Sequence, residues 1–260
     1  MSVKQITSFE NSLIKRVVDL HDKKGRSISR QCMVEGLRAN TTFVQAGMSL
    51  SHLFVTEQTL TEVSSLCPQD KLVLVSETIM KKISLSTTPS GIVGVFYIPD
   101  TPAPQELSAG LVLVQIQDPG NMGTLIRTSV ALGRKSIVIV EGVDPWSPKV
   151  IQASAGTVAL ATIFMWSWQE LLTHKGGLSL CALVVAGGKA PTELALNESL
   201  LVVGNEAHGL PEALQQKCDT FLTLPMPGGA ESLNAAVAGA IALYCAWSQT
   251  SVTHKRDVIA

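Results

Sequence analysis

The fold is decided by the stretch Gln117-Asp118-Pro119-Gly120-Asn121-Met122-Gly123-Thr124-Leu125-Ile126-Arg127. An apolar run at residues 111–116 precedes it and indicates a buried strand, and a helical pattern at 124–132 follows until Gly133. A polar turn with an Asn, two glycines and an Arg is therefore expected at the carboxyl end of a strand. Ligands bind at that edge in open α/β sheets.

Two further turns follow apolar runs in the same way, at residues 204–211 and 225–234. In the first, two glycines bracket Glu206, which could hold a polar ligand group or orient Arg127. In the second, Ser232 is the predicted cap of the last helix and Asn234 falls in its first turn, where free amides attract anions. Taken alone, each turn also fits an ordinary strand–turn–helix connection.

Composition favours a folded protein of one large or two modest domains, since 46% of the 260 residues are hydrophobic and 16% are charged. No apolar run is as long as a membrane span, and the N-terminus lacks the apolar region of a signal peptide, so we expect a cytoplasmic protein without membrane contact. The five cysteines form no CxxC pair. Free thiols are therefore favoured over disulfides or zinc, and no metal is expected.

The chain alternates short strands and helices twice, which predicts an α/β fold. The first alternation fills residues 1–99 and includes expected helices at 11–20 and 60–66 and a basic turn at 22–30. Three prolines at 99–104 break the pattern, so we place a linker at 100–108. In the second alternation, at 109–260, the strands are continuous apolar runs typical of a parallel sheet covered on both faces. A helix capped by Ser147 and a final helix at 232–247 are expected there.

Basic residues gather near the N-terminus. Residues 1–40 hold eight Lys and Arg against four acidic residues, although the whole chain has a net charge of −1. Such a surplus suits a polyanion, but a solvated helix and turn explains it better on charge alone.

Together the three turns resemble the motifs of the SpoU–TrmH family of ribose 2′-O-methyltransferases, in the SPOUT superfamily. The family pattern N-x-G-x-x-x-R is matched by Asn121, Gly123 and Arg127. The other two patterns are matched in order by Gly204-Asn205-Glu206 with Gly209-Leu210, and by Leu224-Pro225-Met226 with Ser232-Leu233-Asn234. Residues 11–20, 33–36 and 90–92 resemble the RNA-binding domain that precedes the enzyme domain in many members.

The resemblance implies a C-terminal parallel-sheet SPOUT domain with a deep trefoil knot, after a smaller N-terminal α/β domain similar to ribosomal-protein and kink-turn-binding folds. It implies S-adenosylmethionine as cofactor, held by Val185, Ala186, Gly187, Gly204, Asn205, Glu206, Leu224, Met226 and Leu233. Arg127 would hold the RNA phosphate and the 2′-hydroxyl, because a guanidinium stays protonated and is a poor base. Catalytic roles in orienting Arg127, the ribose and the cofactor are implied for Asn121, Glu206, Ser232 and Asn234.

RNA is the substrate that the resemblance implies, and the N-terminal domain favours large-subunit ribosomal RNA. Transfer RNA, or RNA binding without catalysis, stays as an alternative. Contacts with RNA are then expected from Lys15, Arg16, Lys23, Lys24, Arg26, Arg30 and Arg38. Family members are homodimers, for which the apolar helix at 234–247 is the candidate interface, although it could instead only cover its own sheet.

Overall fold

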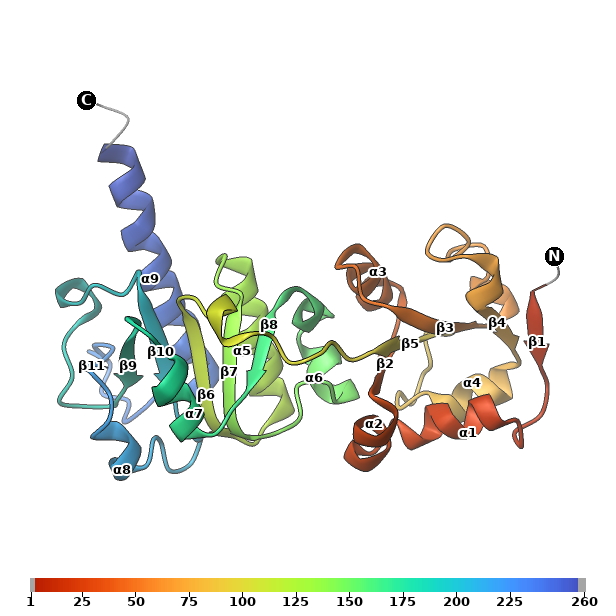
Figure 1. Ribbon diagram of the computed structural model, residues 1–260, viewed down its shortest axis with the longest axis horizontal. Helices are drawn as coiled ribbons and strands as arrows, with labels where there is room; N and C mark the ends of the chain where they lie inside the picture. The colour runs from red at the N-terminus through yellow and green to blue at the C-terminus, as the bar shows by residue number, and fades with distance from the viewer. Residues whose placement is uncertain (1–2, 257–260) are drawn as a thin grey trace. The chain divides into compact units, whose positions relative to one another are not determined.

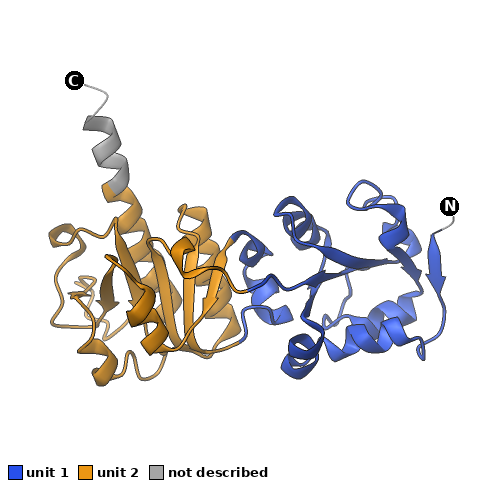
Figure 2. Cartoon of the chain, in the orientation of Figure 1, with its two compact units in different colours: residues 1–100, 144–160 blue, residues 101–143, 161–260 orange. Residues whose placement is uncertain are grey.

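The computed structural model describes residues 3–256, with side chains described as far as Gln249. The chain forms two compact units (Figure 2). Unit 1 comprises the described residues up to Asp100 together with Asp144–Leu160, and unit 2 comprises Thr101–Val143 and the described residues from Ala161 onward. The chain first passes from unit 1 to unit 2 between Asp100 and Thr101, within the expected linker. It then returns to unit 1 for Asp144–Leu160, which differs from the expectation that residues 144–160 belong to the C-terminal domain.

Unit 1 is built on a mixed sheet with strand order β1-β4-β3-β5-β2 (Figure 1). The strands are β1 (Lys4–Ile6), β2 (Gln31–Glu35), β3 (Leu50–Val55), β4 (Leu72–Val75) and β5 (Ile92–Tyr97). Strands β1, β4 and β3 are parallel, and β5 is antiparallel to β3 and β2. Helices α1 (Ser12–Asp19) and α4 (Glu77–Ile83) bury Ile14 and Ile79 against one face. On the other face, the ring of Phe43 in α3 (Leu37–Gln45) packs against that of Phe96, with 5.0 Å between their centroids.

Two local predictions in unit 1 are wrong. The basic turn expected at 22–30 is instead the helix α2 (Lys23–Ser29), which ends at Arg30 in a left-handed conformation with φ of 51°. The helix expected at 60–66 is a run of turns after the short 3₁₀ helix η1 (Glu57–Thr59). Thr61, Val63 and two serines are weak helix formers, and no cap offsets that weakness.

The segment Asp144–Leu160 contains the helix α6 (Pro148–Ala153) and the 3₁₀ helix η4 (Thr157–Leu160). The predicted cap is confirmed, since Ser147 Oγ accepts a hydrogen bond from the Val150 amide. Helix α6 packs on β2, and η4 packs on α3. Gly156, at φ +83°, lies so close to Ala39 that an added Cβ would stand 3.0 Å from the Ala39 Cα. Close packing with α3 therefore assigns this segment to unit 1.

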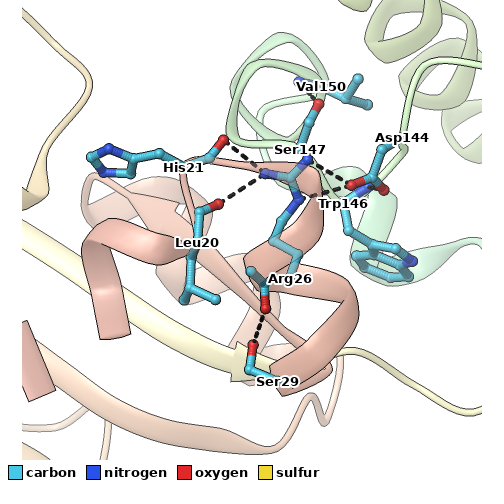
Figure 3. A network of polar contacts seen from close by, with 9 residues as sticks. Leu20, His21, Arg26, Ser29, Asp144, Trp146, Ser147 and Val150 are labelled. Carbon is cyan, nitrogen blue, oxygen red and sulfur yellow. Dashed lines mark hydrogen bonds and ion pairs between the residues drawn. The ribbon is translucent and has the colours of Figure 1, made fainter. Parts of the chain in front are cut away.

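A buried ion pair fixes the start of this segment (Figure 3). Arg26 is only 4% exposed. Its Nε and Nη2 donate to Asp144 Oδ2 at 2.8 and 2.7 Å, and its Nη1 donates to the carbonyls of Leu20 and His21. Asp144 Oδ1 accepts from the Trp146 amide. The prediction that Arg26 contacts RNA is therefore wrong, because all three guanidinium nitrogens are used inside the protein.

Unit 2 contains an all-parallel sheet with strand order β11-β9-β10-β6-β7-β8, as the apolar runs predicted (Figure 1). Its strands are β6 (Gly110–Ile116), β7 (Ser136–Gly142), β8 (Thr162–Met165), β9 (Ser179–Leu183), β10 (Ser199–Val203) and β11 (Thr220–Leu222). Side chains of α7 (Trp168–His174) and α8 (Glu212–Gln215) join the core around Val112 and Val202. Helices α5 (Pro119–Ala131) and α9 (Ala235–Arg256) pack on each other, where Gly239 meets Leu125. The deep knot stays a prediction.

A buried arginine holds the amino-terminal side of this sheet. Arg134 is 8% exposed and has no acidic partner among the described residues. Its Nη1 donates to the carbonyl of Ser199, and its Nη2 donates to those of Leu196 and Asn197 at 2.8 to 3.1 Å. Burial lowers the pKa of its guanidinium, and the three carbonyl dipoles take the place of water.

In the part of the chain that the structure describes, no helix is long and apolar enough to cross a bilayer. Within the same residues, His, Cys, Asp and Glu form no group of three that could hold a metal ion. The cysteines are free thiols.

Candidate active site

The three motif turns of unit 2 meet at one edge of its sheet. They follow β6, β10 and β11, and the carboxyl ends of parallel strands lie on the same side. Between them is a pocket of about 380 Å³, within the size range of small-molecule sites. The edge predicted from the first turn therefore carries a real cavity.

The wall of the pocket contains seven of the nine expected cofactor residues: Val185, Gly204, Asn205, Glu206, Leu224, Met226 and Leu233. Ala186 and Gly187 do not line it, whereas Ser232 does. Sequence reasoning missed apolar wall residues at the strand ends and on α9, namely Leu183, Val203, Leu222, Ala235 and Ala238. The strand-end position of Leu183, Val203 and Leu222 is the signal that could have found these three, whereas Ala235 and Ala238 lie in the first turns of α9.

Gly204 shapes the second turn. A Cβ on it would collide with the backbone of Gly209 and Leu210. Asn205 and Gly209 exchange backbone hydrogen bonds of 3.0 and 2.9 Å across the turn, and Gly209 has φ of +67°. The Asn205 side chain accepts from the amides of Ala207 and His208. Glycine is thus required at 204 because two backbone segments touch there.

Two side chains of this turn reach back to the first turn. Asn205 Nδ2 donates to the carbonyl of Gln115 at 2.8 Å. Glu206 accepts the backbone amides of Gln117 and Asp118 at 3.2 and 3.1 Å, and Asn121 Nδ2 at 3.1 Å. Burial raises the pKa of Glu206, but these hydrogen bonds together outweigh it and leave the pKa below its usual value. Glu206 is therefore ionised at neutral pH and holds the first turn in place.

The third turn joins the same network through Asn234. Its Nδ2 donates to Asn121 Oδ1 at 3.1 Å. Its Oδ1 accepts the amides of Ala236 and Val237, so Asn234 caps α9. The prediction that Ser232 caps this helix is wrong. A continuous chain of polar contacts therefore runs from Glu206 through Asn121 to Asn234, and it links all three turns.

Arg127 stands apart from this chain. Helix α5 begins at Pro119, with Asp118 as its cap, so Asn121 lies in the helix rather than in a turn as predicted. Six helical residues correspond to a rotation of about 600°, which puts Arg127 roughly 120° around the helix from Asn121. Arg127 is exposed and has no hydrogen-bond or ion-pair partner among the described residues. Its guanidinium is free to meet a molecule from outside the chain.

The remaining basic residues expected to contact RNA are exposed in unit 1. Lys15 pairs with Glu10, and Arg30 pairs with Asp100 at 3.0 Å. Arg16, Lys23, Lys24 and Arg38 have no ion-pair partner among the described residues.

Comparisons with known proteins match both units. A model of the SpoU rRNA methylase family matches residues 108–244, and a model of the MRM3-like substrate-binding domain matches residues 11–94. The chain is 30% identical to the 23S rRNA (guanosine(2553)-2′-O)-methyltransferase RlmP of Bacillus subtilis, over 93% of this chain and 98% of that protein. It is 31% identical to an uncharacterised tRNA/rRNA methyltransferase of Synechocystis, over 93% of each chain.

The chain is also similar to solved structures of rRNA methyltransferases. The crystal structure of an AdoMet-bound rRNA methyltransferase from Sinorhizobium meliloti superposes with a TM-score of 0.85 at 28% identity. The alignment covers 95% of this chain and 98% of that one.

Proposed function

Because the chain belongs to the SpoU rRNA methylase family, we propose that it transfers a methyl group from S-adenosylmethionine to a ribose 2′-hydroxyl of large-subunit ribosomal RNA. The observation that carries the proposal is the pocket at the carboxyl edge of the unit 2 sheet, joined to the Glu206–Asn121–Asn234 chain. An apolar cavity beside a fixed polar network suits a small cofactor and a polar acceptor.

The pocket fits S-adenosylmethionine in chemistry as well as size. Leu224, Met226 and Leu233 supply apolar contacts for an adenine ring, and Gly204 lines the same pocket. The related Sinorhizobium meliloti structure is AdoMet-bound, which supports this assignment. When bound, the cofactor would supply a methyl group activated by its sulfonium, from which a neutral thioether leaves.

The chain's own residues then position the acceptor. We assign Arg127 to the RNA phosphate and the 2′-hydroxyl, since it is exposed, unpaired and permanently charged. Glu206 is already engaged by three donors and serves to hold the turn rather than to take a proton. A phosphate oxygen of the RNA or a water molecule accepts the proton of the 2′-hydroxyl.

Ribosomal RNA is favoured over transfer RNA by the substrate-binding unit and by the name of the Bacillus subtilis relative. We also propose that the chain works as a homodimer, with the knot typical of the superfamily. The exposed Val237, Ile241 and Tyr244 of α9 support the homodimer, because an apolar stripe of this kind suits the surface of a partner subunit.

Arg127→Ala tests the proposal. We expect the rate of methyl transfer to fall about 100-fold or more, because a charge that positions the acceptor is lost, while affinity for S-adenosylmethionine stays nearly unchanged. Lys135→Ala, an exposed cation beyond the same helix, is the matched control and should keep full activity. Loss of cofactor binding in the Arg127 variant would contradict the assignment of Arg127 to the RNA rather than to the cofactor. Methylation of transfer RNA alone would favour the other substrate.

A further inference from the structure

Three cations from separate elements act electrostatically on one half-buried histidine in unit 1. His52 lies on β3, and the cations are Lys4 of β1, Arg16 of α1 and Lys71, which directly precedes β4. Burial lowers the pKa of His52 most, and the positive charges of Lys4, Arg16 and Lys71 lower it further. The imidazole is therefore neutral at pH 7, in a region of positive potential.

Strand register places these groups on the same face of the sheet. Lys4 is paired with Val73, and Val73 is paired with Phe54. Paired residues of neighbouring strands share a face, and His52 precedes Phe54 by two residues, so Lys4 and His52 project from that face together. Phe54 and Val73 pack there with the buried side of α1, the helix that carries Arg16.

Further contacts fix the lysine and the histidine. Lys71 Nζ donates to the carbonyl of Leu50 at 2.8 Å, which holds the ammonium beside β3. Its other two donors have no partner among the described residues. The His52 ring lies 6.0 Å from the Phe54 ring, and its Nδ1 contacts Ser51 Oγ at 2.9 Å. Its Nε2 has no hydrogen-bond partner among the described residues. The patch thus offers a fixed nitrogen and free ammonium donors.

None of the three cations makes an ion pair within the part of the chain that is described. The ion pairs of unit 1 use other basic residues. Like charges that gather without an ion-pair partner repel each other, and a bound anion relieves that repulsion.

We propose that Lys4, Arg16, Lys71 and His52, the His52 patch, bind phosphates of the RNA backbone, which rests on the proposed function in that RNA is the substrate. Ammonium and guanidinium groups bind phosphate oxygens by charge-assisted hydrogen bonds. Contacts of this kind set the position of the RNA without reading its sequence. The patch shares only Arg16 with the basic residues expected from the sequence, so it directs the RNA to the face that carries α1.

Charge removal at the patch tests this assignment. The double variant Lys4→Gln with Arg16→Gln is compared with Lys135→Gln with Lys217→Gln, which makes the same charge change. The two control lysines are exposed and precede β7 and β11, at the sheet edge opposite the pocket. Binding of protein-free large-subunit ribosomal RNA is measured from about 50 to 200 mM salt. Thermal unfolding checks that each variant is folded.

The patch variant should bind this RNA roughly 10- to 100-fold more weakly. The plot of log affinity against log salt should become shallower, its negative slope smaller in magnitude by about 1.4 to 1.8, because two phosphate contacts are lost. The control, and the charge-keeping pair Lys4→Arg with Arg16→Lys, should retain the wild-type slope. A patch variant with wild-type affinity and slope overturns the proposal, even if methyl transfer is intact and the proposed function stands. RNA binding that depends on the patch, without any methyl transfer by the wild type, would support the patch and refute the proposed function.

Discussion

Replacement of Glu206 by Gln tests whether one carboxylate holds the first motif turn to the second. Glu206 accepts three hydrogen bonds of 3.1 to 3.2 Å, two from backbone amides and one from Asn121. Gln keeps one acceptor oxygen and turns an NH₂ group toward a donor, so at least one bond is lost. Hydrogen bonds to charged groups contribute about 1.5–3 kcal/mol each, and the exposure of Glu206 favours the low end. We therefore expect a loss of about 1–2 kcal/mol in the free energy of unfolding at pH 7.

The same variant has a pH signature. The pKa of Glu206 in the folded protein lies below the usual value of about 4.3, so the carboxylate stabilises the fold above that pH. This contribution disappears as the pH falls through the folded-state pKa. The difference in unfolding free energy between wild type and Glu206→Gln should therefore be constant from about pH 8 to pH 5 and should narrow below about pH 4.

Urea unfolding and single-turnover methyl transfer measure the two consequences. The displaced turn should slow methyl transfer about 10- to 100-fold, while affinity for S-adenosylmethionine changes less. Glu212→Gln, an exposed carboxylate on α8, is the matched control and should leave stability and rate unchanged. The role of Glu206 would be refuted by a variant with wild-type stability and rate. If the difference in unfolding free energy between wild type and Glu206→Gln became larger in acid, the pKa of Glu206 could not be lowered in the folded protein.

Other perturbations give equally definite expectations. Gly204→Ala forces apart two touching backbone segments and should abolish S-adenosylmethionine binding, measured by calorimetry, while wild-type affinity would contradict the close approach. Arg134→Ala removes three hydrogen bonds, two of them buried, and should lower the free energy of unfolding by about 3 kcal/mol in urea titrations. Asp144→Ala leaves Arg26 buried and unpaired and should cost about 3–5 kcal/mol. Lys15→Ala breaks an exposed ion pair and should lower the free energy of unfolding far less than Asp144→Ala does, so equal losses would refute the burial argument.

The sequence was sufficient to predict the parallel sheet of unit 2, and seven of the nine expected cofactor residues line the pocket. The sheet follows from local signals, since its strands are continuous apolar runs, whereas the cofactor residues were implied by the family resemblance of the motif turns. The resemblance carried by the three motifs is confirmed by the family model over residues 108–244. The predicted helix boundaries were less accurate than the predicted strands. The glycines at 120 and 123 suggested a turn, although Asp118 and Pro119 form a cap and first-turn pair that starts α5 earlier.

The remaining errors concern contacts between distant residues. Arg26 was grouped with the exposed basic residues, because nothing near it in the sequence shows that Asp144, 118 positions away, would bury it. The segment 144–160 was placed with its sequence neighbours for the same reason, although Gly156 fits closely against Ala39. The His52 patch also depends on strand register, which brings Lys4 and His52 to one face.

The most direct test of the proposed chemistry is the identity of the methylated nucleoside. Purified protein is incubated with methyl-labelled S-adenosylmethionine and protein-free large-subunit ribosomal RNA, and the RNA is digested and separated by mass. Transfer to a ribose 2′-hydroxyl predicts label in a single 2′-O-methylated nucleoside, lost when the acceptor position carries 2′-deoxyribose. Label on a base, or no label in any RNA, would contradict the proposed function.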